Sequence, residues 1–348
     1  MLKVLTLVRS VLQFFAEGPV QTTLLDTLGN DLSPEMKTFY DMTLLDYAQA
    51  ALVHDQFGQK RPIPKNGGKK IEFRAFTPLA KALTALTEGV TPDGNTLDVT
   101  KIEAEVAQYG DFIVQSDILE LTAIDNTILE ATKLLGRQAG LTLDTITRNV
   151  LVSGTNVMYA PKIDATTGAE TEVASRSGLD ATAVLTVDLV EQVVAELRAQ
   201  NAPTINGDYV AIIHPYVAYD LMRDPDWRDP HKYQDTTNLY EGEIGKIAGV
   251  RFVQTTEAKI WRGTGCPADL SVFATLFIGD GAYGVTEVSG GGLQTIVKQK
   301  GSAGTADPLD QRSSVGWKAL KTAEILLPTY LIRVESCSKR FSANAAAN

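Results

Sequence analysis

The chain has 348 residues, of which 44% are hydrophobic and 21% are charged. This composition excludes a disordered or fibrous chain, and the length favours two compact lobes over one. The 32 Lys and Arg residues against 42 Asp and Glu residues give a net charge of −10, which disfavours general binding to nucleic acid and to anionic membranes. Only two cysteines are present, Cys266 and Cys337, so the sequence indicates no disulfide framework.

The N-terminal part of the chain predicts two helices. Arg9 interrupts the apolar run in residues 1–15, so this segment is more typical of an amphipathic helix than of a secretion signal. No stretch of the chain approaches the roughly 20 apolar residues of a membrane span. A second helical pattern runs from Pro34 to Phe57, with Ser33 as its expected N-cap.

Residues 56–114 predict a hairpin-like arm. Residues 56–70 contain two prolines, Gly67-Gly68 and basic side chains, which indicate an irregular segment with little to pack on in its own domain. Residues 71–76 alternate as a strand with one apolar face, and residues 106–114 are expected to be its returning partner, with loop between Thr77 and Thr100. Because a two-stranded arm is marginal alone in water, we expect support from a second copy of the chain.

A long amphipathic helix is predicted next. Asp117 and Glu120 have the spacing of a capping box, and apolar residues recur at helical spacing from Leu121 to Val150. The pattern ends at Ser153, after about ten turns or roughly 50 Å. Such a helix is expected to form the spine of an elongated protomer.

The C-terminal half predicts a second lobe of mixed structure. Residues 155–184 have the composition of a surface loop or linker, and a helix is expected at 187–200. Strands are predicted at 209–213, 250–253, 270–278, 323–327 and 331–334, with a short helix after His214. Scattered strands without βαβ alternation indicate the α+β class.

Motifs for catalysis are weak or missing. Residues 279–284 have the spacing of a dinucleotide-binding loop, but a strand and a turn are expected after them where the chemistry needs a helix N-terminus. The histidines His54, His214 and His231 lack the spacing of metal ligands, and neither cysteine has the context of a nucleophile. We therefore expect no catalytic residue, no cofactor and no metal, and we expect His214 to cap backbone.

Opposite charges are segregated along the predicted arm, with bases on the outgoing limb and acids after it. Solubility of an exposed loop is one interpretation, and recognition of an acidic surface on the next subunit is the other. The second is favoured because the arm needs a partner. The candidate inter-subunit contacts are Lys60, Arg61, Lys65, Lys69, Lys70, Arg74, Phe73, Phe76, Glu88, Asp93, Asp98 and Glu103.

From about residue 30 onward, the order and spacing of several segments resemble the major capsid proteins of tailed bacteriophages, in particular the subgroup related to the coat protein of podophage N-four. The segments that carry the resemblance are 32–36 with Tyr40 and 44–45, 63–64, 68–73, 88–89 with Pro92, 108–110, 212–215, 242–245, 249–251, 307–311 and 316–318. The resemblance implies the Hong Kong 97-type fold and no catalysis.

The implied fold divides the chain into an N-terminal arm with helices, an extended loop, a peripheral domain with the spine helix, an axial domain and returning C-terminal strands. The corresponding ranges are 1–57, 58–112, 113–184, 185–312 and 313–348. The resemblance also implies pentamers and hexamers that close an icosahedral shell around double-stranded DNA. The role of the first 20 or so residues stays open.

The implied partners are other copies of the chain, with portal, scaffolding and decoration proteins as further candidates and DNA enclosed without sequence-specific binding. The expected location of the protein is the virion shell, which would assemble in the host cytoplasm. No membrane is expected to take part. Two alternatives remain at this point. One is the shell protein of an encapsulin-like compartment, which shares the fold. The other is a nucleotide-binding enzyme in which residues 279–284 bind a cofactor.

Overall fold

The computed structural model describes residues 42–48, 52–62, 70–76, 79, 81–83, 85, 89, 94–97, 99–118, 127–164, 167–227, 243–286, 293–302 and 307–348. The chain divides into two compact units. Unit 1 consists of Met1–Tyr47, Gly110–Gly136 and Gln294–Lys318, and unit 2 consists of Ala48–Tyr109, Arg137–Leu293 and Ala319–Asn348.

Unit 1 contains a three-stranded sheet and the first part of a long helix. The sheet has the order β14–β15–β4, and the helix is α4. Their bounds are β4 Ala107–Ser116, β14 Leu293–Lys298, β15 Arg312–Lys321 and α4 Thr127–Val152, so each of these elements runs on into unit 2.

The core of unit 1 depends on close backbone approaches. Residues 42–48 are helical and bury Leu44 against α4. A Cβ atom added at Gly136 of α4 would lie 2.9 Å from the carbonyl oxygen of Leu44, so only glycine allows the two helices this contact. At the N-terminus of α4, Gln115 and Thr127 exchange two hydrogen bonds of 3.0 and 3.1 Å.

Unit 2 is built around a seven-stranded mixed sheet with the order β5–β17–β12–β8–β10–β9, to which β11 adds by pairing with β12. Strands β8 and β12 are buried along their whole length, as expected for the centre of a covered sheet. The bounds are β5 Val157–Tyr159, β8 Tyr209–Ile213, β9 Glu243–Ile247, β10 Val250–Gln254, β11 Ile260–Trp261, β12 Val272–Ile278 and β17 Leu331–Ser336.

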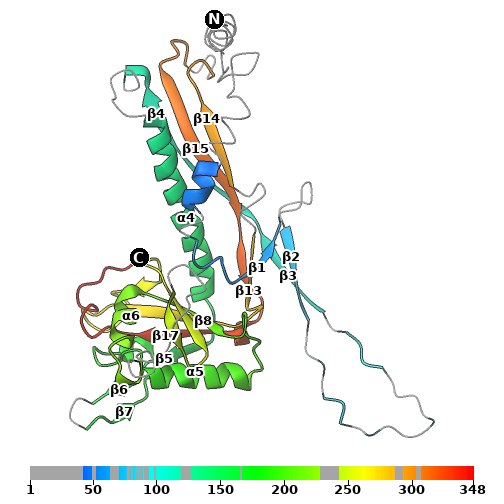
Figure 1. The fold of residues 1–348 in the computed structure, drawn as a ribbon, viewed down its shortest axis with the longest axis vertical. Helices are drawn as coiled ribbons and strands as arrows, with labels where there is room; N and C mark the ends of the chain where they lie inside the picture. Colours follow the sequence, from blue (N-terminus) through cyan, green and yellow to red (C-terminus); the bar gives the residue numbers. More distant parts are fainter. Residues whose placement is uncertain are drawn as a thin grey trace, which may run out of the picture. The chain divides into compact units, whose positions relative to one another are not determined.

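Two helices of unit 2 pack on this sheet (Figure 1). Helix α5, Val187–Ala199, is capped by the hydroxyl of Thr186, which accepts a hydrogen bond from the backbone N–H of Leu189. Helix α6, Pro215–Leu221, is capped by His214, whose Nδ1 accepts from the backbone N–H of Tyr216 at 3.1 Å. The expected capping role of His214 is therefore confirmed.

Smaller sheets and two 3₁₀ turns make up the rest of what the structure describes of unit 2. Strand β1 pairs in parallel with β13, which pairs with β16, while β2 with β3 and β6 with β7 form two-stranded ribbons. Their bounds are β1 Gln59–Arg61, β2 Lys70–Phe76, β3 Val99–Glu105, β6 Lys162–Ile163, β7 Glu170–Thr171, η1 Arg176–Gly178, β13 Tyr283–Thr286, β16 Ala323–Ile325 and η3 Pro328–Tyr330.

The structure confirms the α+β class and the main elements of the second lobe, namely α5, β8, α6, β10, β12, β16 and β17. Residues 155–184, predicted as loop, contain β5, β6, β7 and η1. Both cysteines are free, and within the described ranges no helix is long and apolar enough to cross a membrane.

Three predictions in the first half of the chain were wrong. The helical pattern predicted from Pro34 to Phe57 does not persist to its end, because residues 54–57 form a turn, and the segment predicted as irregular contains β1. The partner of β2 is β3 and not residues 106–114, because β4 pairs with β15 in another sheet. Helix α4 spans Thr127–Val152. Residues 117–118, at the expected start of the long helix, are also helical, and residues 119–126 lie outside the described part.

Neighbouring leucines of α4 test the packing of this helix. Leu135 is 2% exposed and Leu134 is 65% exposed. We expect Leu135→Asp to lower the free energy of unfolding by roughly 3–5 kcal/mol, because it buries an unpaired charge, whereas Leu134→Asp should change it by less than about 0.5 kcal/mol. Urea denaturation of both variants measures the difference, and equal stabilities would contradict the packing.

Candidate functional site

The β2–β3 ribbon, which we call the arm together with the chain between its strands, leaves the body of unit 2 (Figure 1). In the antiparallel register Lys70 lies opposite Glu105 and Phe76 lies opposite Val99. Side chains alternate between two faces, so one face holds apolar residues and the other holds charges. These two faces have different roles.

The apolar face of the arm packs on its own unit. Phe73, Ile71 and Ala104 are buried in a cluster with Leu326, which follows β16. A Cβ atom added at Gly284 of β13 would lie 2.3 Å from Cε1 of Phe73, so the glycine makes room for the ring. Phe73 is therefore a core residue of its own chain and anchors the arm. Because its side chain is fully buried, it is not available for the predicted inter-subunit contact.

The charged face of the arm is paired within the ribbon. Lys70 forms an ion pair with Glu103 at 2.8 Å, and Lys101 pairs with Glu72 at 2.6 Å and with Glu103 at 2.9 Å. These contacts hold the pKa of the Glu103 carboxyl at about 2, through the hydrogen bond from Lys70 first and that from Lys101 second. All four side chains are exposed, so these pairs contribute little to stability but do fix the charge pattern of the face.

Three cations of the predicted set remain without an ion pair to any described residue. Arg74 lies opposite Lys101 in the ribbon, so its cross-strand neighbour is a like charge. Lys60 and Arg61 are exposed on β1. The predicted contacts Lys65, Lys69, Glu88, Asp93 and Asp98 lie outside the described residues, as does the side chain of Phe76.

The outgoing limb of the arm is docked on unit 2 before the ribbon starts. Phe57 is buried, and a Cβ atom added at Gly58 would lie 2.5 Å from the ring of Tyr283. The next residues form β1, which pairs with Gly284–Thr286 of β13. The prediction that residues 56–70 have little to pack on in their own domain was therefore wrong for residues 57–61, while residues 63–69 lie outside the described part.

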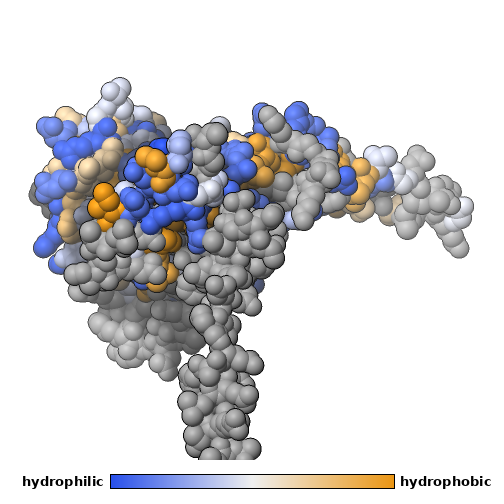
Figure 2. Space-filling view, turned by 90° about the horizontal axis from the view of Figure 1, so that it is seen from above, coloured by the Kyte–Doolittle hydropathy of each residue, from blue (hydrophilic) through white to orange (hydrophobic). Residues whose placement is uncertain are grey.

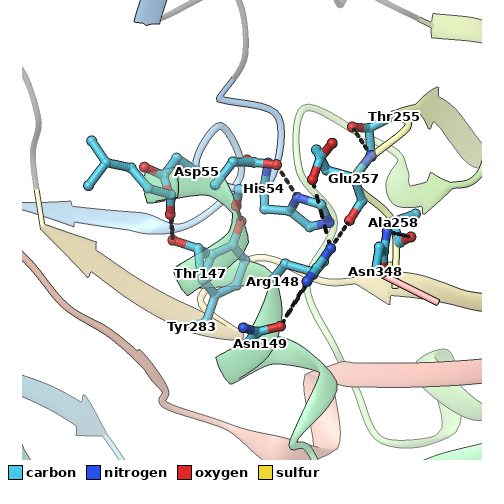
Figure 3. A network of polar contacts seen from close by, with 12 residues as sticks. His54, Asp55, Thr147, Arg148, Asn149, Thr255, Glu257, Ala258, Tyr283 and Asn348 are labelled. Carbon is cyan, nitrogen blue, oxygen red and sulfur yellow. Dashed lines mark hydrogen bonds and ion pairs between the residues drawn. The ribbon is translucent and has the colours of Figure 1, made fainter. Parts of the chain in front are cut away.

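A buried polar network holds the root of this limb on α4 (Figure 3). The carboxylate of Asp144 accepts from the backbone N–H of His54 and bonds its ring Nδ1, both at 2.7 Å. Asp55 accepts from the hydroxyl of Thr147 at 2.6 Å and forms an ion pair with Lys321 of β15. The hydroxyl of Tyr283 donates to the carbonyl oxygen of His54.

Arg148 extends the network from α4 to the segment after β10 (Figure 3). Its guanidinium donates to the carbonyl oxygen of Glu257 at 2.8 Å and to the side chain of Asn149 at 3.1 Å. Burial lowers the pKa of Arg148, while Glu257 and Asp144 oppose that shift. Burial, followed by the charges of Asp55 and Asp144, raises the pKa of Tyr283. The hydroxyl of Tyr283 therefore stays protonated and keeps its donor role.

We call the group of Asp55, Lys321, His54, Asp144 and Thr147 the anchor. All five side chains are buried, so each charged group depends on its partner for solvation. Removing one member would leave a buried charge unpaired, which is the costly way to break such a contact. The anchor therefore fixes where the arm leaves unit 2. Sequence reasoning missed it, since its members are as many as 267 positions apart, between His54 and Lys321.

The described residues give little support for catalysis or cofactor binding. They contain no group of three or more His, Cys, Asp or Glu side chains placed to hold a metal ion. Residues 279–284 connect β12 to β13 through a turn, with Gly281 at φ 70°, and no helix starts there. The predicted glycine-rich turn is thus confirmed, and a helix N-terminus for a phosphate is missing at this position.

Comparison with known proteins connects this architecture to a family. A family model described as phage capsid protein matches residues 122–277. Similar solved structures include the capsid of Ralstonia phage GP4, with 13% identity and a TM-score of 0.66 over 84% of this chain and 90% of that chain. Residues 122–277 thus match the phage capsid family, and the chain shares its fold with phage capsids.

Two further capsids share the fold. The capsid of cyanophage P-SCSP1u has 14% identity and a TM-score of 0.59, covering 81% of this chain and 87% of that one. The acid-stable capsid of Helicobacter pylori bacteriophage KHP30 has 12% identity and a TM-score of 0.55, covering 82% and 88%. No curated protein matches the chain. The arm is the first surface to consider for contacts with other copies of the chain.

The buried pair of the anchor gives a stability prediction. We expect Asp55→Ala to lower the free energy of unfolding by roughly 3–5 kcal/mol, because Lys321 is left buried without a partner. The double variant Asp55→Leu/Lys321→Met should recover most of that loss, since no buried charge remains. Urea denaturation at pH 7 measures both. Lys101→Met is the exposed control, and it should change the free energy of unfolding by less than about 1 kcal/mol. Wild-type stability of Asp55→Ala would contradict the anchor.

The ion pairs of the arm give a titration prediction. Because the pKa of Glu103 is lowered to about 2 from 4.5, the pairing is present above pH 4.5 and is lost as the pH falls through 2. We expect Lys70→Met to move the Glu103 pKa upward, and Lys60→Met, on β1, to leave it unchanged. Carboxyl NMR of the unassembled subunit measures both, and a normal pKa in the wild type would show that the ribbon pairs do not form.

Proposed function

We propose that this protein is the major subunit of a tailed-phage shell, in which hexamers and pentamers close an icosahedral particle around double-stranded DNA. The observation that carries the proposal is the capsid family match at residues 122–277, within a chain that shares 84% of its length with a phage capsid structure. An encapsulin-like compartment and a nucleotide-binding enzyme have no specific observation in their favour.

The arm supports the proposal because several of its exposed side chains lack a partner within the described chain. Leu79, Leu83 and Leu97 are at least 60% exposed, and the surface of this region mixes hydrophobic with hydrophilic side chains (Figure 2). Arg74 lies nearby without an ion pair to a described residue. A two-stranded ribbon with such side chains is marginal in water, so contact with a second copy would stabilise it.

The finer parts of the proposal follow the sequence resemblance. They are the subgroup of podophage N-four, the five domain ranges, and assembly in the host cytoplasm with portal, scaffolding and decoration proteins as partners. Packaged DNA would be enclosed without sequence-specific contacts, in keeping with the net charge of −10. The inter-subunit contacts proposed here are the cations Lys60, Arg61 and Arg74, together with Lys65, Lys69, Phe76, Glu88, Asp93 and Asp98.

Charge reversal of the unpaired cations tests the arm. The triple variant Lys60→Glu/Arg61→Glu/Arg74→Glu should block formation of capsomers and shells at low salt, because it places like charges on an acidic neighbour. Light scattering and electron microscopy of the purified protein measure assembly. Wild-type shells should form more slowly at high salt, since screening acts over about 10 Å at 0.1 M and about 3 Å at 1 M.

The matched control removes charges that the ribbon already pairs. Lys70→Met/Glu103→Met keeps the net charge and deletes an internal pair, so it should assemble like the wild type. If the triple variant formed normal shells, the proposal that these cations take part in the inter-subunit contact would be contradicted. A wild-type protein that stays monomeric over a wide concentration range would contradict the proposed function itself.

A further inference from the structure

A second exposed surface of unit 2 combines aromatic rings with arginines, and it lies on α6 and the C-terminal segment. Tyr216 of α6 stacks on Phe341, with ring centroids 4.3 Å apart and planes 14° apart. Tyr219, one turn further along α6, meets the same Phe341 edge-on at 5.7 Å. Tyr216 is 38% exposed and Met222 is 37% exposed, so the centre of this surface reaches solvent.

Two arginines lie near these rings, and a lysine precedes one of them in the chain. The guanidinium of Arg223 lies 5.5 Å and that of Arg340 lies 6.0 Å from the centroid of Tyr219, within the range of a cation–π contact. Arg223 also donates to the hydroxyl of Tyr219 at 2.9 Å, and Lys339 is exposed beside Arg340. We call these residues, with Tyr216, Phe341 and Met222, the cationic patch.

Two carboxylates beside the cationic patch accept hydrogen bonds from uncharged groups. Asp220 accepts from the hydroxyl of Ser338 at 2.6 Å and from the backbone N–H of Lys339 at 3.0 Å. Asp224 accepts from two backbone N–H groups, those of Val187 and Asp226. No ion pair links Arg223, Lys339 or Arg340 to a described residue. Asp220 and Asp224 keep their charge, because all of these donors are uncharged, and the three cations lie beside them without forming ion pairs.

A surface of the opposite sign lies on α5 of the same unit. Asp188, Glu191 and Glu196 are exposed on this helix. Asp188 and Glu196 accept hydrogen bonds from glutamines four residues later, at 2.7 and 2.6 Å, which orients the carboxylates without neutralising them. None of the three forms an ion pair with a described residue. The one cation of the helix, Arg198, lies against Gly249.

We propose that the cationic patch of one copy binds the acidic face of α5 on the next copy. Tyr, Met and Arg are the residue types enriched at protein interfaces, with a rigid aromatic centre and a charged rim. The two surfaces lie on different helices of one unit, so their contact can repeat head to tail from copy to copy, and it forms a ring where the rotation between copies closes. This inference rests on the proposed function, because it supplies a contact within the capsomer ring.

Charge exchange between the two surfaces tests the inference. Arg223→Glu/Arg340→Glu and Glu191→Lys/Glu196→Lys should each raise the critical concentration for ring formation at least about tenfold, which corresponds to about 1.4 kcal/mol. The quadruple variant restores opposite signs across the contact and should return to within about threefold of the wild type. Light scattering and electron microscopy of the full chain at pH 7 give the values.

Two controls separate contact from folding. Arg223→Lys/Arg340→Lys keeps the charges and should retain most of the assembly, and far-UV circular dichroism should be unchanged in every variant. Normal assembly by both double variants, or no recovery in the quadruple variant, would overturn this inference while the wild type still assembles. Unchanged rings that lose DNA retention would assign the cationic patch to nucleic acid and would also overturn it.

Discussion

The buried pairing of Asp55 with Lys321 and of His54 with Asp144 is the constraint on which the arm depends. Each carboxylate is removed from water and is solvated only by side chains and backbone groups that come from other parts of the chain. Because the partners belong to α4 and β15, two long elements, the root of the arm cannot shift without breaking charged contacts. A two-stranded ribbon has little rigidity of its own, so its direction is set at this root.

The pairing inside the ribbon changes which charges are available to a partner. Sequence alone presents a basic limb followed by an acidic one, yet Lys70, Lys101, Glu72 and Glu103 satisfy one another across the two strands. The cations that are left without an ion pair to a described residue are Lys60, Arg61 and Arg74. Exposed leucines lie in the segment between the two strands. The arm therefore offers a partner a mixed surface, in which burial of apolar area supplies affinity and the unpaired cations supply orientation.

Assembly of identical copies needs more than one contact of this kind. An arm that reaches a neighbour and a head-to-tail contact between α6 and α5 would use separate surfaces of the same protomer, so weak exposed pairs would add over many copies. Weak individual contacts allow errors in assembly to dissociate. The buried anchor has the opposite property, because it is strong, internal and present in every copy before contact.

The sequence by itself determined the α+β class, the helices α5 and α6, the buried strands β8 and β12, and the resemblance to phage capsid proteins. These follow from local periodicity, capping residues and apolar runs, which act over a few neighbouring residues. It also identified residues 71–76 as a strand with one apolar face. It chose the wrong partner, because alternation defines a face but not a neighbour, and both 99–105 and 106–114 alternate.

Only the tertiary structure decided which strand pairs with β2, that Phe73 fills the space left by Gly284, and that the anchor exists. Asp55 and Lys321 are 266 positions apart and look like ordinary surface residues in the sequence. Their burial depends on how α4, β13 and β15 come together, and no local pattern encodes that arrangement. Long-range pairing is a property of the packed chain, because the free energy of a buried charge is set by the groups that surround it in space.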